Sequence, residues 1–117
     1  MFKKLFVLLA IPVLLAGSMQ AQADPVGGTQ TAYTNVLAHR TDVYRLECWG
    51  GQQTQVNVVG DGDTNLMVLV YDDAGNLIVT DTGVSATVTF TVFRTGTFTI
   101  KVINLGDVYN HYFIKVW

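Results

Sequence analysis

Oxygen-bearing side chains in two turn-like segments are the best candidates for chemistry in this sequence. The segment from Gly60 to Asn65 reads Gly-Asp-Gly-Asp-Thr-Asn, and Asp72-Asp73 follows the next apolar run. Alternating carboxylate and amide oxygens in a turn suit a hard cation such as calcium. The alternative is a pair of solvated turns between strands, which need no ion. The candidate calcium ligands are Asp61, Asp63, Asn65 and Asp72.

The residue types needed for nucleophilic or zinc catalysis are sparse. Ser85 is the only serine after residue 23, and no G-x-S-x-G elbow surrounds it. His39 and His111 are far apart and stand in no zinc-binding spacing. A small hydrolase would need a polar cleft with a carboxylate of perturbed pKa, of which the sequence gives no sign. We therefore expect no enzyme and no required cofactor.

Cys48 is the only cysteine, so the chain cannot form an internal disulfide. Tyr44, Leu46 and Cys48 alternate along one apolar face, which favours a buried thiol that acts as a small apolar side chain. The alternative is an intermolecular disulfide through Cys48. In either case the domain depends on its hydrophobic core for stability.

The N-terminal segment has the pattern of a secretory signal. Lys3 and Lys4 precede an apolar run from Leu5 to Ala16, and Ala21-Gln22-Ala23 supplies the small residues that signal peptidase requires. The apolar run is shorter than the roughly 20 residues of a membrane-spanning helix. We expect a signal peptide at 1–23, a flexible leader at 24–30 and one domain at 31–117, in a secreted or periplasmic protein.

Charge narrows the classes of partner. The chain has 7 basic and 9 acidic residues, and removal of Lys3 and Lys4 leaves 5 basic and 9 acidic, a net charge near −4. Nucleic acids and anionic membrane surfaces recruit basic patches. We therefore expect no nucleic-acid partner, and no transmembrane segment after signal cleavage.

Short runs rich in Val, Thr, Ile, Phe and Tyr follow one another after residue 30, separated by Gly, Asp and Asn. In the clearest run, 86–92, apolar residues alternate with threonines, and 97–102 repeats the pattern after Arg94-Thr95-Gly96, which predicts a hairpin. The pattern as a whole predicts an all-β fold, an antiparallel two-sheet sandwich of jelly-roll type with about eight strands. We expect strands near 31–38, 42–49, 53–59, 65–72, 76–80, 85–93, 96–103 and 109–117.

Four motifs in register resemble the bacterial pre-peptidase C-terminal (PPC-like) domain. They are Gly60–Leu66, Val70–Leu77, Thr95–Asn104 and Asn110–Ile114. The resemblance implies a β-sandwich without enzymatic activity, of a family that usually follows secreted proteases and other hydrolases, and in which some members bind calcium or a polymer. Asn65 and Met67 stand where that family usually has aspartates.

Two functions remain open at this point. The first is a secreted, non-catalytic module that binds a protein or polymer at the cell envelope or outside, through an exposed surface that includes Trp49, Tyr71 and Tyr109. The second is a structural or assembly protein of the envelope, which would form an oligomer through Cys48 or through an edge strand at Tyr112–Trp117.

Overall fold

The computed structural model describes residues 8–11 and 29–117, and every regular element among them is a strand. Eight strands follow residue 29 and confirm the predicted all-β fold. No helix in the described part of the chain is long and apolar enough to cross a membrane. The strands are β1 (Leu8–Ile11), β2 (Gln30–Val36), β3 (Thr41–Cys48), β4 (Gln52–Val59), β5 (Leu66–Tyr71), β6 (Leu77–Gly83), β7 (Ser85–Val92), β8 (Gly96–Asn104) and β9 (Asn110–Val116).

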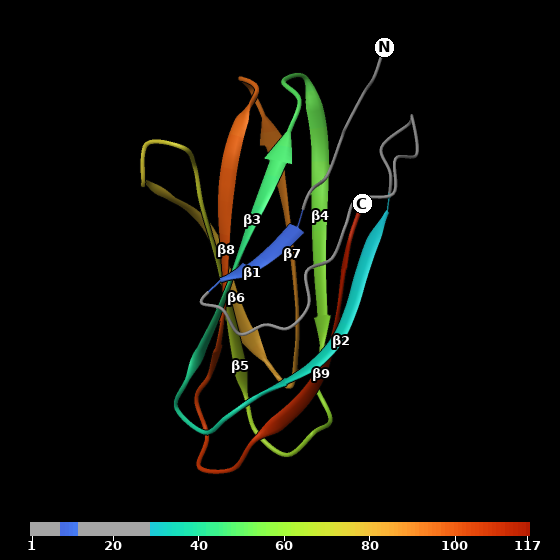
Figure 1. The fold of residues 1–117 in the computed structure, drawn as a ribbon, viewed down its shortest axis with the longest axis vertical. Coiled ribbons are helices and arrows are strands. Elements are labelled where there is room, and N and C mark those ends of the chain that lie inside the picture. The colour runs from blue at the N-terminus through green and yellow to red at the C-terminus, as the bar shows by residue number, and fades with distance from the viewer. Residues whose placement is uncertain (1–7, 12–28) are drawn as a thin grey trace.

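Two antiparallel sheets pack face to face (Figure 1). Sheet A has the order β1-β3-β8-β5-β6, and sheet B has the order β2-β9-β4-β7. From β2 onward the chain changes sheet at every connection except the one between β5 and β6. This is the jelly-roll arrangement that the strand spacing predicts. Strand β1, which lies in the expected signal peptide, pairs with β3 at the edge of sheet A.

The predicted hairpin between 86–92 and 97–102 is wrong. Strand β7 pairs with β4, whereas β8 pairs with β3 and β5 in the other sheet. Both strands have one apolar face, and these faces meet across the core, where the rings of Phe90 and Phe98 lie 5.5 Å apart. A short connection between two amphipathic strands fits either arrangement, so local pattern does not distinguish them.

The expected edge strand at Tyr112–Trp117 also needs correction. Strand β9 lies inside sheet B, with β2 paired along one side and β4 along the other. Its inward-facing residues Tyr112, Ile114 and Val116 are buried in the core between the two sheets. This strand therefore offers no free edge to another molecule, and assembly through it would require the sheet to open.

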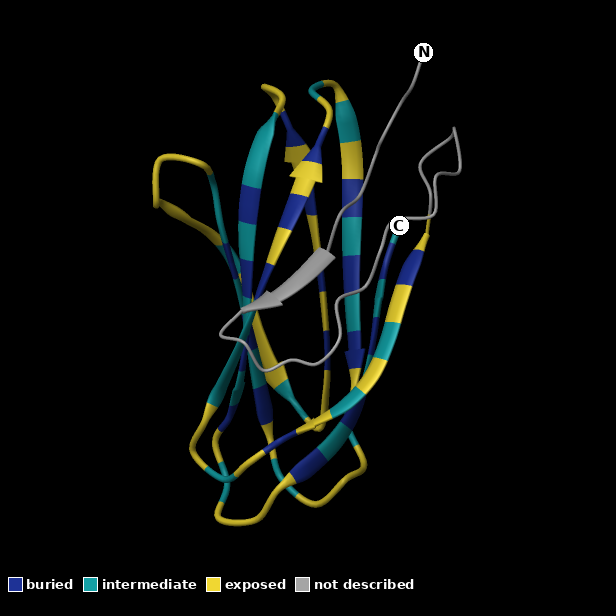
Figure 2. Cartoon of the chain, viewed as in Figure 1, coloured by how far each residue is buried: buried dark blue, intermediate teal, exposed yellow. Residues whose placement is uncertain are grey.

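The core forms where alternating residues of the two sheets face each other (Figure 2). Strand β7 shows the pattern fully, since its threonines are exposed and its alternate residues from Ala86 to Val92 are buried. Cys48 belongs to this core, with 1% of its surface exposed. An intermolecular disulfide would require the end of β3 to leave the core.

A short hydrogen-bond chain joins the two sheets within this core. The Tyr112 hydroxyl of β9 donates to Asp42 Oδ2 at 2.6 Å, and the hydroxyls of Tyr44 and Tyr112 lie 2.5 Å apart. Because the Tyr112 proton goes to Asp42, Tyr44 is the donor to Tyr112. Burial raises the pKa of both phenols and of the Asp42 carboxyl. At Asp42 the hydrogen bond from Tyr112 acts in the opposite direction and lowers the pKa, but burial has the larger effect. The chain therefore fixes β3 against β9.

Replacement of Tyr112 by phenylalanine tests this chain of hydrogen bonds. The change leaves the buried Tyr44 hydroxyl and the half-buried Asp42 carboxylate without their partner. We expect urea unfolding to show a loss of about 1–3 kcal/mol, the cost of such unpaired groups. Tyr109→Phe is the control, because the Tyr109 ring is 51% exposed and this change should leave stability unaltered. Equal stability of Tyr112→Phe and the wild type would contradict the proposed role.

Candidate functional site

The structure divides the sequence-predicted site residues between two regions. Asp61, Asp63 and Asn65 lie in the β4–β5 connection, at the same end of the sandwich as Tyr109 in the β8–β9 connection (Figure 1). Asp72, Tyr71 and Trp49 lie toward the opposite end. We call the first region the loop end; it comprises the connections 37–40, 60–65 and 105–109.

Asn104 joins the three connections of the loop end from inside the sandwich. Its side chain is completely buried, and its Nδ2 donates to the carbonyl oxygens of Leu37 at 3.3 Å and Val108 at 2.7 Å. Its Oδ1 accepts from the Thr64 hydroxyl at 2.7 Å. One side chain therefore contacts the β2–β3, β4–β5 and β8–β9 connections.

Asn110 supports the same end from the start of β9. It is also fully buried; its Nδ2 donates to Thr64 Oγ1 at 2.8 Å, and its Oδ1 accepts from the Asp61 backbone at 3.2 Å. Gly106 packs so closely that a Cβ at this position would lie 2.3 Å from Thr64 Cγ2. The arrangement therefore holds both loops in one geometry.

Sequence reasoning did not select Asn104 and Asn110 as site residues. The alternation of inward- and outward-facing residues could have identified Asn104, because it continues the inward-facing series Phe98, Ile100 and Val102. A polar amide in such a series must find several hydrogen-bond partners. It therefore marks a place where loops close over the core.

Asp61 uses its carboxylate to fix the turn that carries it. Its Oδ2 accepts from the His111 backbone at 2.9 Å, and its Oδ1 accepts from the Asp63 backbone at 3.0 Å. These N–H groups hold the pKa of the Asp61 carboxyl below its usual value. Gly62 between the two aspartates has φ of 92°, a conformation that favours glycine.

The four candidate calcium ligands do not meet. Asp72 is separated from Asn65 by the length of β5, about 20 Å at the usual rise of a strand, and its carboxylate accepts from the backbones of Ala74 and Asn76. Hydrogen bonding by the Asn76 backbone lowers its pKa. Among the described residues, no three His, Cys, Asp or Glu side chains gather into a set that could hold a metal ion. Calcium binding by Asp61, Asp63 and Asn65 stays a prediction.

The loop end and β2 carry several exposed apolar side chains. The His111 ring stacks on Tyr33, with centroids 5.5 Å apart, and meets the edge of Tyr109 at 5.7 Å. Three acids, Asp61, Asp63 and Asp107, border them, and Asp107 pairs with His39 at 2.7 Å. We use the term loop-end surface for His111, these acids and five of the exposed apolar residues, Tyr33, Leu37, Leu105, Val108 and Tyr109. Other exposed apolar residues lie elsewhere, among them Trp49, Leu77, Ile78 and Phe93.

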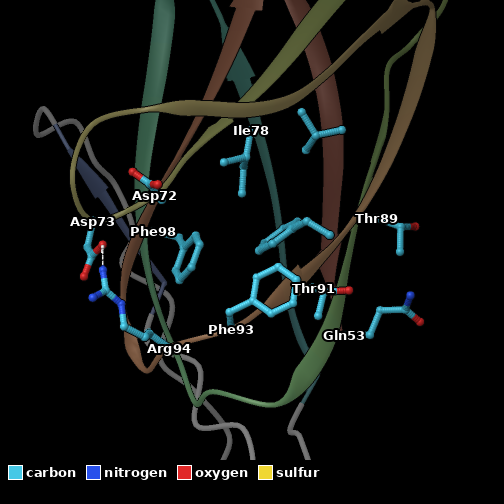
Figure 3. Close-up of a pocket in the computed structure, with 11 residues that line it drawn as sticks. Gln53, Asp72, Asp73, Ile78, Thr89, Thr91, Phe93, Arg94 and Phe98 are labelled. Atoms are coloured by element: carbon cyan, nitrogen blue, oxygen red, sulfur yellow. Dashed lines mark ion pairs between the residues drawn. The ribbon is translucent and has the colours of Figure 1, made fainter.

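A separate hollow of about 580 Å³ opens near the other end of the sandwich, beside β6 and the β7–β8 connection (Figure 3). Phe90 and Phe98 are buried beneath it, and Phe93 is 87% exposed beside it. Arg94 and Asp73 form an ion pair of 3.7 Å among its lining residues. The hollow can take an apolar group, but its two charged partners already neutralise each other.

Trp49 and Tyr71 do not join Tyr109 in one binding surface. Trp49 lies just after β3 with 39% of its surface exposed. Tyr71 lies on the outer face of sheet A, where the Lys101 ammonium is 4.9 Å from the centre of its ring. Of the three aromatic residues proposed from the sequence, only Tyr109 belongs to the loop-end surface.

The lowered pKa of Asp61 predicts how the loop end responds to acid. Because the folded state holds the carboxylate ionised, its contribution to stability is present above the usual pKa of 3.8 and is lost as pH falls through the lower pKa of the folded state. We expect the melting temperature of the wild type to exceed that of Asp61→Asn at neutral pH, and the difference to shrink below pH 3.8. Asp63→Asn is the control, and a difference independent of pH would contradict the assignment.

Comparisons with known proteins support the fold. No protein-family model and no curated protein matches the chain. The chain is similar in structure to PliG of Aeromonas hydrophila, a periplasmic lysozyme inhibitor of g-type lysozyme, with a TM-score of 0.59 and 15% identity, over 75% of this chain and 83% of that one. The β-sandwich implied by the resemblance to the PPC-like domain is confirmed, whereas membership of that family has no support from a family model.

Proposed function

We propose that the protein is an exported, non-catalytic module that binds another protein through its loop-end surface. The presence of exposed apolar and aromatic side chains at one end, on loops fixed by buried asparagines, is the observation that carries the proposal. Aromatic residues surrounded by polar groups are the usual anchors of protein interfaces. Loops that are already ordered lose little conformational entropy on binding.

Charge favours a cationic partner. The loop end carries three acids, Asp61, Asp63 and Asp107, against one arginine, Arg40, and a border of net negative charge selects partners of opposite charge and speeds their encounter. A g-type lysozyme is the first candidate, because the structurally similar protein is an inhibitor of that enzyme. The similarity of fold to PliG supports the proposal that the partner is a protein. The exposed apolar residues of the loop-end surface support the proposal that the partner binds there.

Export accounts for the N-terminal segment in this proposal. Cleavage after Ala23 would remove β1 and leave β3 as the edge of sheet A, while the buried residues of the described core all lie between Gln30 and Val116. A periplasmic or secreted location agrees with the periplasmic location of the similar protein.

Mass spectrometry of the exported protein tests this cleavage. We expect the mature chain to begin at Asp24, because Ala21 and Ala23 supply the small residues that signal peptidase requires. The same chain should melt cooperatively, since the buried residues of the described core all lie between Gln30 and Val116. Ala23→Lys is the matched variant, and it should accumulate as the uncleaved precursor. A mature protein that keeps its first residues would contradict the export proposal.

Titration against a g-type lysozyme tests the binding surface. We expect the purified protein to bind the lysozyme and lower its activity, and Tyr109→Ala to weaken the affinity about tenfold or more, as the loss of an aromatic anchor does. Phe93→Ala is the matched control, because it removes an exposed ring at the opposite end. Its affinity should stay within about twofold of the wild type.

Three outcomes would count against parts of this proposal. Absence of binding to the lysozyme would remove that enzyme as the partner. Absence of binding to every cationic envelope protein tried would contradict the protein-binding function. A loss of affinity in Phe93→Ala that equals the loss in Tyr109→Ala would move the interface away from the loop end.

A further inference from the structure

The outer face of sheet A carries a shallow hollow of about 500 Å³ beside the turn between β5 and β6. Arg45 of β3, Thr99 of β8 and Tyr71 of β5 form one row across three strands, because Thr99 is the antiparallel partner of the other two. Lys101 lies two residues along β8, over the Tyr71 ring. The residues that line the hollow are Arg45, Tyr71, Asp72, Asp73, Gly75, Thr97, Thr99 and Lys101.

The acids of this hollow have hydrogen-bond or ion-pair partners, whereas its cations form no ion pair among the described residues. The Asp72 carboxylate accepts hydrogen bonds within its own turn, and Asp73 pairs with Arg94. The ion pairs of 4.0 Å or less between described residues are Asp73–Arg94 and His39–Asp107, so Arg45 and Lys101 take part in neither.

Geometry places the two cations where one anion can contact both. Arg45 and Lys101 are diagonal neighbours on adjacent strands, a relation that puts their Cβ atoms about 7–8 Å apart. Glu47 follows Arg45 on the same face of β3, but it lies outside the residues that line the hollow. With Arg94, which pairs with Asp73, three cations stand against the two carboxylates Asp72 and Asp73, and Arg45 and Lys101 are the two cations that form no ion pair among the described residues.

We infer that this hollow binds the carboxylate of an acidic saccharide. The planar guanidinium of Arg45 matches a carboxylate with two parallel hydrogen bonds, and the Tyr71 ring holds the Lys101 ammonium beside it. The hydroxyls of Thr97 and Thr99 can donate to and accept from sugar hydroxyls. An open, shallow surface on a sheet suits an extended polymer. This site is independent of the loop-end surface and of the proposed protein partner.

Affinity electrophoresis of the purified protein in gels that contain polygalacturonate tests the inference. We expect polygalacturonate to retard the protein, neutral dextran to leave its mobility unchanged, and added salt to weaken the effect. Arg45→Gln should weaken the affinity about tenfold, because a charge-assisted bidentate contact is lost. Lys115→Gln is the matched control: its ammonium lies 4.6 Å from the Trp117 ring centre on the other sheet, and its loss should leave the affinity unchanged.

Each remaining outcome bears on the inference. Retention of polygalacturonate binding by Tyr109→Ala would support a site separate from the loop end. No retardation by polygalacturonate, equal retardation by dextran, or unchanged affinity in the Arg45→Gln, Lys101→Gln double variant would overturn it. Equal or tighter binding of polyglutamate would overturn the assignment to a saccharide. Unchanged melting temperatures of the variants establish that they fold.

Discussion

The geometry of the loop end depends on the hydrogen bonds of one buried side chain, Asn104. Its amide nitrogen lies within hydrogen-bond distance of three carbonyl oxygens, those of Val36, Leu37 and Val108. An amide has two protons, so the adjacent carbonyls of Val36 and Leu37 share one. Its oxygen accepts from Thr64 and from the backbone of Gly106. An apolar residue here would fill the volume but would leave those backbone groups buried without partners, a cost that water cannot relieve.

This constraint explains how a jelly roll without a disulfide can present an ordered surface. The chain changes sheet at nearly every connection, so the loops at one end come from distant parts of the sequence. Apolar packing between the sheets fixes the strands but leaves such loops undetermined. Asn104 and Asn110 supply the missing directional contacts, because each reaches a loop from a strand already fixed by the core. Tyr109 and the acids around it therefore stand on a rigid base.

The positions of most strands could be predicted from the alternation of apolar and polar residues, because this alternation is a local property of the sequence. The same pattern could not decide which strands pair, which is why β7 and β8 were wrongly joined as a hairpin and β9 was taken for an edge. The sequence offers Asp61 as a calcium ligand or as part of a solvated turn, and in the structure its carboxylate accepts hydrogen bonds from the backbones of His111 and Asp63. The separation of Asp72 from the other acids follows from strand direction, which local composition does not contain.

The net charge of the chain does not predict the charge of an individual surface. A net charge near −4, expected for the chain without residues 1–23, is a sum over the whole chain, and salt screens its effect beyond the Debye length. At contact, the relevant quantity is which charges are already paired. In the turn after β5, Asp72 accepts hydrogen bonds from backbone N–H groups, which stabilise its ionised form, and Asp73 pairs with Arg94. On the adjoining face of sheet A, Arg45 and Lys101 form no ion pair among the described residues, whereas the loop end carries Asp61, Asp63 and Asp107 against the single arginine Arg40. One acidic domain can therefore present both a face with unpaired cations and an end that is rich in carboxylates.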